Sequence, residues 1–268
     1  MPSLFHQCQT VTSPPPRSVK LMTCGSVDDG KSTLIGRLLF EANLITEDQL
    51  ARLKHLSKRH GTSDEQIDFS LLLDGLSAER EQGITIDVAY RFFNTSIRSF
   101  RIADVPGHEQ YTKNMVTGAS TAEIAILLVD ASQGLSEQTR RHSFIVSLLG
   151  IRQIVPAINK IDLPYYNSTA VSKTEAQDSA MAEPLAFETI MPIPISAKHG
   201  DNIIKNSENT PWYTDTPLLQ YLEGIEVSSS EPDAGYVMPI QWVNRQISDF
   251  RGFAGTLAAG SIKPGQKV

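Results

Sequence analysis

The sequence predicts an α/β fold, a doubly wound domain with a mostly parallel sheet that is followed by the start of a β domain. Residues 124–129 and 151–158 are nearly continuous apolar runs, and the helical pattern of residues 136–149 separates them. Runs of this kind are typical of parallel strands that helices cover on both faces. A strand at residues 19–24 leads through a glycine-containing loop into a helix at residues 32–40, so a strand–loop–helix unit opens the domain.

Periodicity and turn residues predict the elements between these runs. Paired strands are expected at residues 84–93 and 97–103, and a more polar helix is expected at residues 47–59. Residues 193–195 supply a last short strand.

The stretch 164–192 has the weakest pattern. Pro184 interrupts its only helical segment, residues 174–189, so no long amphipathic helix is expected there. A final helix is expected further on, with Thr216 as its N-cap and Pro217 at its first helical position.

A polar linker then precedes residues 237–243 and 253–257, which have the pattern of strands bounded by glycines. So few strands cannot bury a core of their own. The chain is therefore expected to be a fragment of a longer protein.

Composition excludes several classes of protein. Of the 268 residues, 40% are hydrophobic and 20% are charged, which excludes a wholly disordered or fibrous chain. The formal charge of −6 gives no basic surface for general nucleic-acid binding, so a nucleic-acid partner is not expected. Cys8 and Cys24 are the only cysteines, which excludes a disulfide framework and favours a cytoplasmic location. No apolar run approaches the ~20 residues that cross a bilayer, so no membrane partner is expected.

A phosphate-binding loop follows the first predicted strand. Its pattern G-x-x-x-x-G-K-[ST] is carried by Gly25, Ser26, Val27, Asp28, Asp29, Gly30, Lys31 and Ser32. Backbone N–H groups of such a loop surround phosphates, the lysine neutralises the β- and γ-phosphates, and the Ser32 hydroxyl is a candidate Mg²⁺ ligand. An ordinary glycine turn before a helix is the alternative, and the strand before the loop makes it less favoured.

Three further motifs follow three further predicted strands. After residue 103 come Asp104, Val105, Pro106 and Gly107, where a carboxylate can reach a metal through water and the glycine amide can meet a γ-phosphate. After residue 158 come Asn159, Lys160, Ile161 and Asp162, and after residue 195 come Ser196, Ala197 and Lys198. Taken alone, each motif can also be an ordinary polar turn at the end of a strand. Their order, each at the carboxyl end of a strand, favours one nucleotide site along that edge of the sheet.

The Asp162 carboxylate predicts the base. Guanine offers it the N1–H and 2-amino donors, neither of which adenine presents. The sequence therefore predicts GTP rather than ATP.

Thr85 and His108 are candidates for roles that depend on the γ-phosphate. The Thr85 hydroxyl can join the Mg²⁺ shell while that phosphate is present, although a β-branched strand residue is the alternative. His108 directly follows Gly107, where a neutral imidazole can orient the attacking water. The other histidines are predicted to be solvated or capping residues: His6, His55, His60, His142 and His199.

The chain resembles the translation-factor class of GTPases and, more closely, the GTPase subunit of sulfate adenylyltransferase. The resemblance is carried by residues 24–33, 78–90, 108–120 and 137–143. Elongation factors typically carry His in place of Asp29 and Arg-Asp-Phe in place of residues 109–111. The resemblance covers residues 19–163 closely and residues 191–268 more loosely.

The resemblance implies GTP and Mg²⁺ as the bound groups. Residues 25–33, Thr33 included, would bind phosphates; Ser32 and Thr85 would ligate Mg²⁺, and Asp104 would act through water. His108 would be catalytic, and the motifs at 159–162 and 196–198 would bind guanine. The partner would be the small catalytic subunit of sulfate adenylyltransferase in a heterodimer, where GTP hydrolysis drives ATP and sulfate to adenosine 5′-phosphosulfate and pyrophosphate.

The expected organisation has four parts: a disordered tail at residues 1–18, a GTP-binding domain at 19–226, a linker at 227–235, and the beginning of a β-barrel domain at 236–268. Two alternatives stay open at this point: a translation factor that delivers charged tRNA, and a truncated module that binds nucleotide without turnover.

Overall fold

The computed structural model describes residues 18–59, 67–73, 85–227, 235–245 and 251–267. The chain divides between Ile225 and Glu226 into two compact units, which are described separately. The predicted tail lies outside the described residues except for Ser18, as does the predicted linker at 228–234.

One sheet of seven strands forms the centre of the larger unit, in the order β2-β3-β1-β4-β5-β6, with β7 also paired to β5. β2 runs antiparallel to β3, and the other pairs are parallel. The strands are β1 (Ser18–Cys24), β2 (Ala89–Asn94), β3 (Ser99–Asp104), β4 (Ile124–Asp130), β5 (Gln153–Asn159), β6 (Thr189–Ile190) and β7 (Ile193–Pro194). The predicted fold class, a mostly parallel sheet with helices between its strands, is confirmed.

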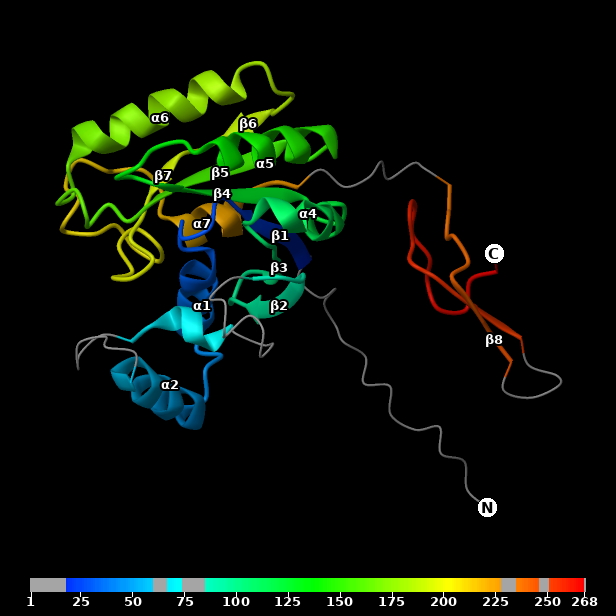
Figure 1. The fold of residues 1–268 in the computed structure, drawn as a ribbon. Helices are drawn as coiled ribbons and strands as arrows, with labels where there is room; N and C mark the ends of the chain where they lie inside the picture. Colours follow the sequence, from blue (N-terminus) through cyan, green and yellow to red (C-terminus); the bar gives the residue numbers. More distant parts are fainter. Residues whose placement is uncertain (1–17, 60–66, 74–84, 228–234, 246–250, 268) are drawn as a thin grey trace. The chain divides into compact units, whose positions relative to one another are not determined.

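Helices cover both faces of this sheet. Figure 1 shows α1 and α7 on one side and α4, α5 and α6 on the other, with α2 beyond α1. The helices and 3₁₀ turns are α1 (Lys31–Glu41), α2 (Glu47–Arg59), η1 (Phe69–Leu72), η2 (Glu109–Tyr111), α4 (Thr112–Ala119), α5 (Glu137–Leu148), α6 (Ser168–Ala182) and α7 (Leu218–Gly224).

The central strands are buried because every residue of β4 is apolar except its last, Asp130. Side chains on successive positions point to opposite faces, so Leu127 and Val129 pack with Met115 of α4 and Val146 of α5 in one buried cluster. This packing fixes the carboxyl ends of the parallel strands along one edge, where the loops that carry the motifs begin.

The region between residues 164 and 192 differs from the sequence prediction. A 15-residue helix, α6, begins at Ser168, where the Asn167 side chain accepts a hydrogen bond from the Thr169 N–H, and ends two residues before Pro184. Its buried residues are Val171, Thr174, Asp178 and Ala182. Two of these four are polar, so the helical face lacks the apolar stripe by which such helices are recognised.

Two other boundaries were predicted wrongly. β2 begins at Ala89 rather than at residue 84, since residues 85–88 have no strand pairing. Helix α7 begins at Leu218 with Pro217 at its N-cap, and no side chain caps it. The carbonyl of Thr216 instead accepts a hydrogen bond from the Tyr213 hydroxyl.

The smaller unit is an antiparallel pair of strands, β8 (Trp242–Asn244) and β9 (Gly252–Ala254), with a bridge between Val237 and Ala259. Both strands are shorter than predicted. Trp242 and Phe253 are more than half exposed, so this unit has little buried core within the described residues.

Candidate nucleotide site

The loop from Gly25 to Gly30 connects β1 to α1 and needs two glycines for its shape. Gly25 has φ 140° and Gly30 has φ 93°, a left-handed conformation at the N-cap of α1. A Cβ added to Gly30 would lie 2.3 Å from the Asn159 side-chain nitrogen, so a larger residue there would displace the loop that follows β5.

Lys31 lies buried at the start of α1, and its ammonium group points back into the loop. Its Nζ donates hydrogen bonds to the carbonyl of Ser26 at 2.6 Å and to that of Gly25 at 3.3 Å. Burial lowers the pKa of Lys31, while the carboxylates of Asp29 and Asp104 oppose that shift. A Cβ on Gly107 would lie 2.4 Å from this Nζ and 3.0 Å from the carbonyl oxygen of Gly25, so the motif after β3 lies against the phosphate loop.

Asp29 is folded into the loop itself. Its Oδ2 accepts a hydrogen bond from the Ser26 N–H at 2.6 Å. Burial, the largest influence, raises the pKa of Asp29 to about 6 against the opposing effects of that hydrogen bond and of Lys31.

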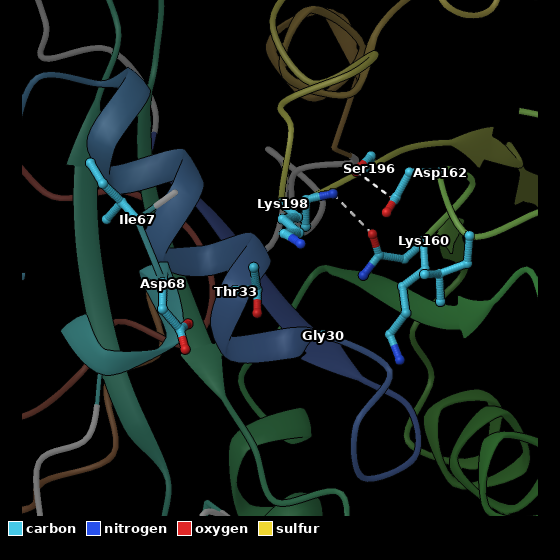
Figure 2. A pocket seen from close by; sticks show the side chains of 11 residues that line it. Gly30, Thr33, Ile67, Asp68, Lys160, Asp162, Ser196 and Lys198 are labelled. Atoms are coloured by element: carbon cyan, nitrogen blue, oxygen red, sulfur yellow. Dashed lines mark hydrogen bonds between the residues drawn. The ribbon is translucent and has the colours of Figure 1, made fainter. Parts of the chain in front are cut away.

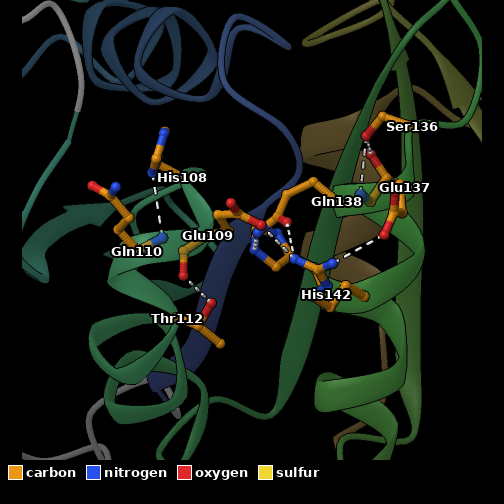
Figure 3. Close-up of polar contacts among 10 residues, drawn as sticks. His108, Glu109, Gln110, Thr112, Ser136, Glu137, Gln138 and His142 are labelled. Atoms are coloured by element: carbon orange, nitrogen blue, oxygen red, sulfur yellow. Dashed lines mark hydrogen bonds and ion pairs between the residues drawn. The ribbon is translucent and has the colours of Figure 1, made fainter.

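His142 was predicted to be solvated or capping, and this prediction is wrong. It is fully buried on α5, and its Nδ1 accepts a hydrogen bond from the N–H of Gly25 at 3.1 Å. Burial and the nearby Lys31 lower its pKa to about 4, so the imidazole is neutral with its proton on Nε2. Nε2 lies 2.9 Å from the side-chain nitrogen of Gln138. Figure 3 shows His142 reaching away from α5 toward the loop side.

Hydrophobic periodicity does not identify His142, because the inward face of α5 is mostly polar. The buried residues of α5 are Thr139, His142, Ser143 and Val146. This spacing defines one inward face of a helix, and His142 lies in the middle of it. Its partner is 117 residues away, so only the folded structure identifies the contact.

A cavity of about 240 Å³ lies over the phosphate loop and collects residues from distant segments. The lining residues are Val27, Asp28, Gly30, Lys31, Ser32, Thr33, Ser70, Thr85, Gly107 and Lys160. The hydroxyls of Ser32 and Thr85 therefore share one cavity, and hydroxyl oxygens are among the ligands that Mg²⁺ prefers. Thr85 lies before β2, next to Ile86, whose carbonyl accepts a hydrogen bond from the Asn114 side chain at 2.9 Å.

A second cavity, of about 340 Å³, adjoins the first at Gly30, Thr33 and Lys160, which line both. Figure 2 shows Asp162, Ser196 and Lys198 on one side of Thr33 and Ile67 and Asp68 on the other. The lining residues are Gly30, Thr33, Ile67, Asp68, Asn159, Lys160, Asp162, Leu163, Ser196, Ala197 and Lys198.

Asn159 holds three loops together at this cavity. Its Nδ2 donates to the carbonyl of Asp29 at 2.8 Å, and its Oδ1 accepts from the N–H of Ala197 at 3.0 Å. Asp162 is oriented from the same side, since its Oδ1 accepts from the Ser196 hydroxyl at 2.8 Å. The motifs after β1, β5 and β7 are thus hydrogen-bonded to one another.

Lys160 lines both cavities. Its backbone is left-handed, with φ 62°, and its ammonium binds Oδ2 of the buried Asp130 at 2.8 Å. Burial raises the pKa of Asp130, but hydrogen bonds from Lys160 and Ser132 outweigh it and lower that pKa overall. Ile161 is buried behind this lysine.

His108 and Asp104 do not line either cavity. The His108 Nδ1 accepts a hydrogen bond from the Gln110 N–H at 3.3 Å and so caps the 3₁₀ turn η2. The next residue, Glu109, forms an ion pair with Arg141 of α5 at 2.9 Å (Figure 3). Asp104 is buried at the end of β3, followed by the buried Val105 and Pro106.

The described residues contain neither a metal-binding cluster of acidic, His or Cys side chains nor a helix suited to span a membrane. No group of three or more His, Cys, Asp or Glu side chains is placed to hold a metal ion there. No helix among them has the length and apolar character needed to cross a membrane.

A family model described as "Elongation factor Tu GTP binding domain" matches residues 16–226. The chain belongs to this family. Within it, the chain is 56% identical over 250 residues to sulfate adenylyltransferase subunit 1 of Methylorubrum extorquens, an alignment that covers 93% of the chain and 53% of that protein. It is equally identical to the bifunctional enzyme NodQ of a Rhizobium species, of which it covers 39%. The predicted resemblance is confirmed, and the chain spans about half the length of the subunit 1 relatives it matches.

Solved structures of this elongation factor Tu-like family agree with the fold. The GTPase-like domain of S. cerevisiae Ski7, bound to GTP, aligns with a TM-score of 0.70 at 19% identity and covers 94% of the chain and 60% of that structure. Sup35 complexed with GDP aligns with a TM-score of 0.59 at 23% identity and covers 95% of the chain and 56% of that structure. At these identities the likeness concerns the fold.

Proposed function

We propose that this chain binds GTP with Mg²⁺ and hydrolyses it as the GTPase part of a sulfate adenylyltransferase. The observation that carries the nucleotide assignment is the pair of adjoining cavities that share Gly30, Thr33 and Lys160. One cavity is lined by the phosphate loop and the other by Asp162, so a single ligand with phosphates at one end and a base at the other suits both.

In this proposal, phosphates lie over the loop N–H groups of residues 25–33, and Lys31 leaves the carbonyls of Gly25 and Ser26 to bind β- and γ-oxygens. Ser32 and Thr85 are the direct Mg²⁺ ligands, and Asp104 acts through water. A bound Mg²⁺ would neutralise the charge that develops on the phosphates.

Asp162 reads the base in this proposal. Its carboxylate accepts from the N1–H and 2-amino group of guanine, and the Ser196 hydroxyl holds the carboxylate in place. Ala197, Lys198 and the stem of Lys160 pack beside the base. Adenine would offer this carboxylate neither of these two donors, and a ligand that lacks the hydrogen-bonding groups a site is built for is strongly disfavoured.

His108 is proposed to orient the attacking water. Because it caps η2 and does not line the phosphate cavity, this role requires the segment after Gly107 to move toward the γ-phosphate. Such rearrangements on γ-phosphate binding are the usual behaviour of GTPase switch segments.

The sulfate-activating role rests on the relatives. By analogy with the proteins called sulfate adenylyltransferase subunit 1, the partner is a small catalytic subunit that forms adenosine 5′-phosphosulfate from ATP and sulfate. We place this heterodimer in the cytoplasm. GTP turnover would then depend on a protein partner rather than on the chain alone.

A calorimetric titration of the chain with GDP, GTP, ADP and ATP tests the nucleotide assignment. Guanine nucleotides should bind well above adenine nucleotides, and Asp162→Asn should shift the preference toward xanthine nucleotides, whose 2-oxo group suits an amide donor. Asp215→Asn, at an exposed position outside both cavities, is the matched control. Equal affinities for ATP and GTP would overturn the assignment of Asp162.

The sulfate role has its own test. GTP turnover of the chain is measured with and without a sulfate adenylyltransferase catalytic subunit, in the presence of ATP and sulfate. Stimulation by that subunit is expected, and turnover that the subunit leaves unchanged would contradict the assignment.

A further inference from the structure

The segment before and within η1 forms a wall of the nucleotide site. Ile67 and Asp68 line the base-side cavity, whereas Ser70, two residues on, lines the phosphate-side cavity. This short segment therefore spans the junction of the two cavities. In any nucleotide the sugar lies between base and phosphates, so the sugar belongs at this junction.

The wall is fixed to both neighbouring helices. The Asp68 N–H donates to the hydroxyl of Ser57, a buried residue of α2, at 2.9 Å. Phe69 is buried, and its ring lies 5.1 Å, centroid to centroid, from that of Phe40 on α1. A Cβ on Gly36 would come within 2.3 Å of the Phe69 carbonyl oxygen, so η1 sits directly on the α1 backbone.

The Asp68 carboxylate is held in one orientation by its own turn. Its Oδ1 accepts from the N–H of Ser70 at 3.0 Å and from the Ser70 hydroxyl at 2.5 Å, which caps η1. Among the described residues, none donates a hydrogen bond to Oδ2. Asp68 is only half-buried and lines the base-side cavity, so this carboxylate oxygen is available to a ligand.

The chemistry of a guanine nucleotide leaves one partner for this oxygen. Phosphates carry only acceptors and negative charge, and they lie in the other cavity. The donors of the guanine edge are those that Asp162 is placed to accept. The remaining donors are the 2′- and 3′-hydroxyls of the ribose.

We infer that Asp68 recognises the ribose of the bound nucleotide by accepting a hydrogen bond from a ribose hydroxyl at Oδ2. This inference rests on the proposed guanine-nucleotide site and deepens it, because it makes the site selective for the sugar as well as for the base. It also links α2 to the nucleotide through the hydrogen bond between Ser57 and Asp68.

The test compares GDP, 2′-deoxy-GDP and 3′-deoxy-GDP by calorimetric titration of the chain. The unmodified chain should bind at least one deoxy analogue about ten-fold more weakly than GDP, since a hydrogen bond to a charged acceptor is lost. Asp68→Ser retains a hydroxyl that can cap η1 but removes the second oxygen. This variant should bind GDP more weakly by a similar factor, and its affinities for GDP and deoxy-GDP should lie within about two-fold of each other.

Asp48→Ser, at an exposed position in the first turn of α2, is the matched control and should leave both affinities unchanged. Equal binding of GDP and both deoxy analogues by the unmodified chain would overturn the ribose contact and leave the nucleotide site standing. If Asp68→Ser lowered the affinities for GDP and both deoxy analogues by the same factor, Asp68 would have only a structural role, and the inference would also be overturned. Failure of the unmodified chain to bind GDP would instead overturn the proposed function, and this inference with it.

Discussion

The imidazole of His142 accepts a hydrogen bond from the first N–H of the phosphate loop, that of Gly25, across 3.1 Å. The adjacent residue on α5, Arg141, forms an ion pair with Glu109 at 2.9 Å. Consecutive residues of one helix therefore hold the phosphate loop and the turn that follows His108. A displacement of α5 would be transmitted to both.

His142→Ala is expected to weaken GDP binding by about ten-fold, because the Gly25 amide loses its buried acceptor and the loop is no longer held in shape. His142→Asn should retain more of the affinity, since its side-chain oxygen can lie near the position of Nδ1. Titration calorimetry checks both variants, with His55→Ala on the exposed side of α2 as control. Unchanged affinity in His142→Ala would mean that the loop keeps its shape without this contact.

The sequence could predict that the motifs meet, and it could not predict what holds them. Parallel strands end along one edge of a sheet, so the loops after residues 24, 103, 158 and 195 had to be neighbours. The hydrogen bonds from Asn159 to Asp29 and from Gly25 to His142 join residues more than a hundred positions apart. No local pattern encodes such a contact.

The start and end of helix α6 were predicted wrongly for a related reason. Its N-cap, Asn167, is a recognisable start signal, and Pro184 lies just after its end rather than within it. However, the buried face contains Thr174 and Asp178 beside Val171. Hydrophobic periodicity locates a buried face only where that face is apolar, so it did not locate this one.

Asp178 makes the free energy of unfolding depend on pH. It is 1% exposed on α6, and neither of its oxygens has a hydrogen-bond partner among the described residues. Burial, and then the nearby Glu175, raise its pKa to about 7 from an ordinary 3.8. Above pH 7 the folded chain must bury the charge, whereas between pH 7 and about pH 4 it binds a proton that the unfolded chain does not.

Asp178→Asn should therefore raise the free energy of unfolding at pH 8 by about 1–3 kcal/mol, and this gain should shrink as the pH falls through 7 toward 4. Urea denaturation at pH 8 and pH 5 measures the difference. Glu183→Gln, exposed just beyond the same helix, is the control and should show little change at either pH. A gain in Asp178→Asn that is equal at both pH values would show that the Asp178 carboxyl does not titrate in this range.

Substitutions of Lys31 and Ser32 should affect nucleotide binding in different ways, because Lys31 supplies a positive charge and Ser32 a metal ligand in the proposed site. Lys31→Ala should abolish tight binding of GDP and GTP, since the Lys31 ammonium lies in the phosphate loop itself, whereas the Lys160 ammonium is paired with Asp130. Ser32→Ala should leave the nucleotide affinity measured without metal nearly unchanged and remove most of the increase in affinity that added Mg²⁺ gives. Titrations with and without Mg²⁺ distinguish the two variants. If Ser32→Ala kept the full magnesium dependence, the metal would bind elsewhere.

Turnover should depend on His108 more than binding does. The His108 side chain caps η2 through Gln110 and does not line the phosphate cavity, so His108→Ala should change GTP affinity by no more than a few-fold. Orienting a water in line with the γ-phosphate is a positioning effect, and its loss should slow single-turnover hydrolysis by about ten-fold or more. The comparison is made in the complex with the catalytic subunit, because the isolated chain is expected to hydrolyse GTP slowly even when unmodified. Glu109→Gln is the control, because it loses the charge that pairs with Arg141 and keeps His108. It distinguishes the effect of disturbing η2 from the effect of removing the imidazole. Hydrolysis by the His108→Ala complex at the unmodified rate would leave His108 as a cap of η2 and nothing more.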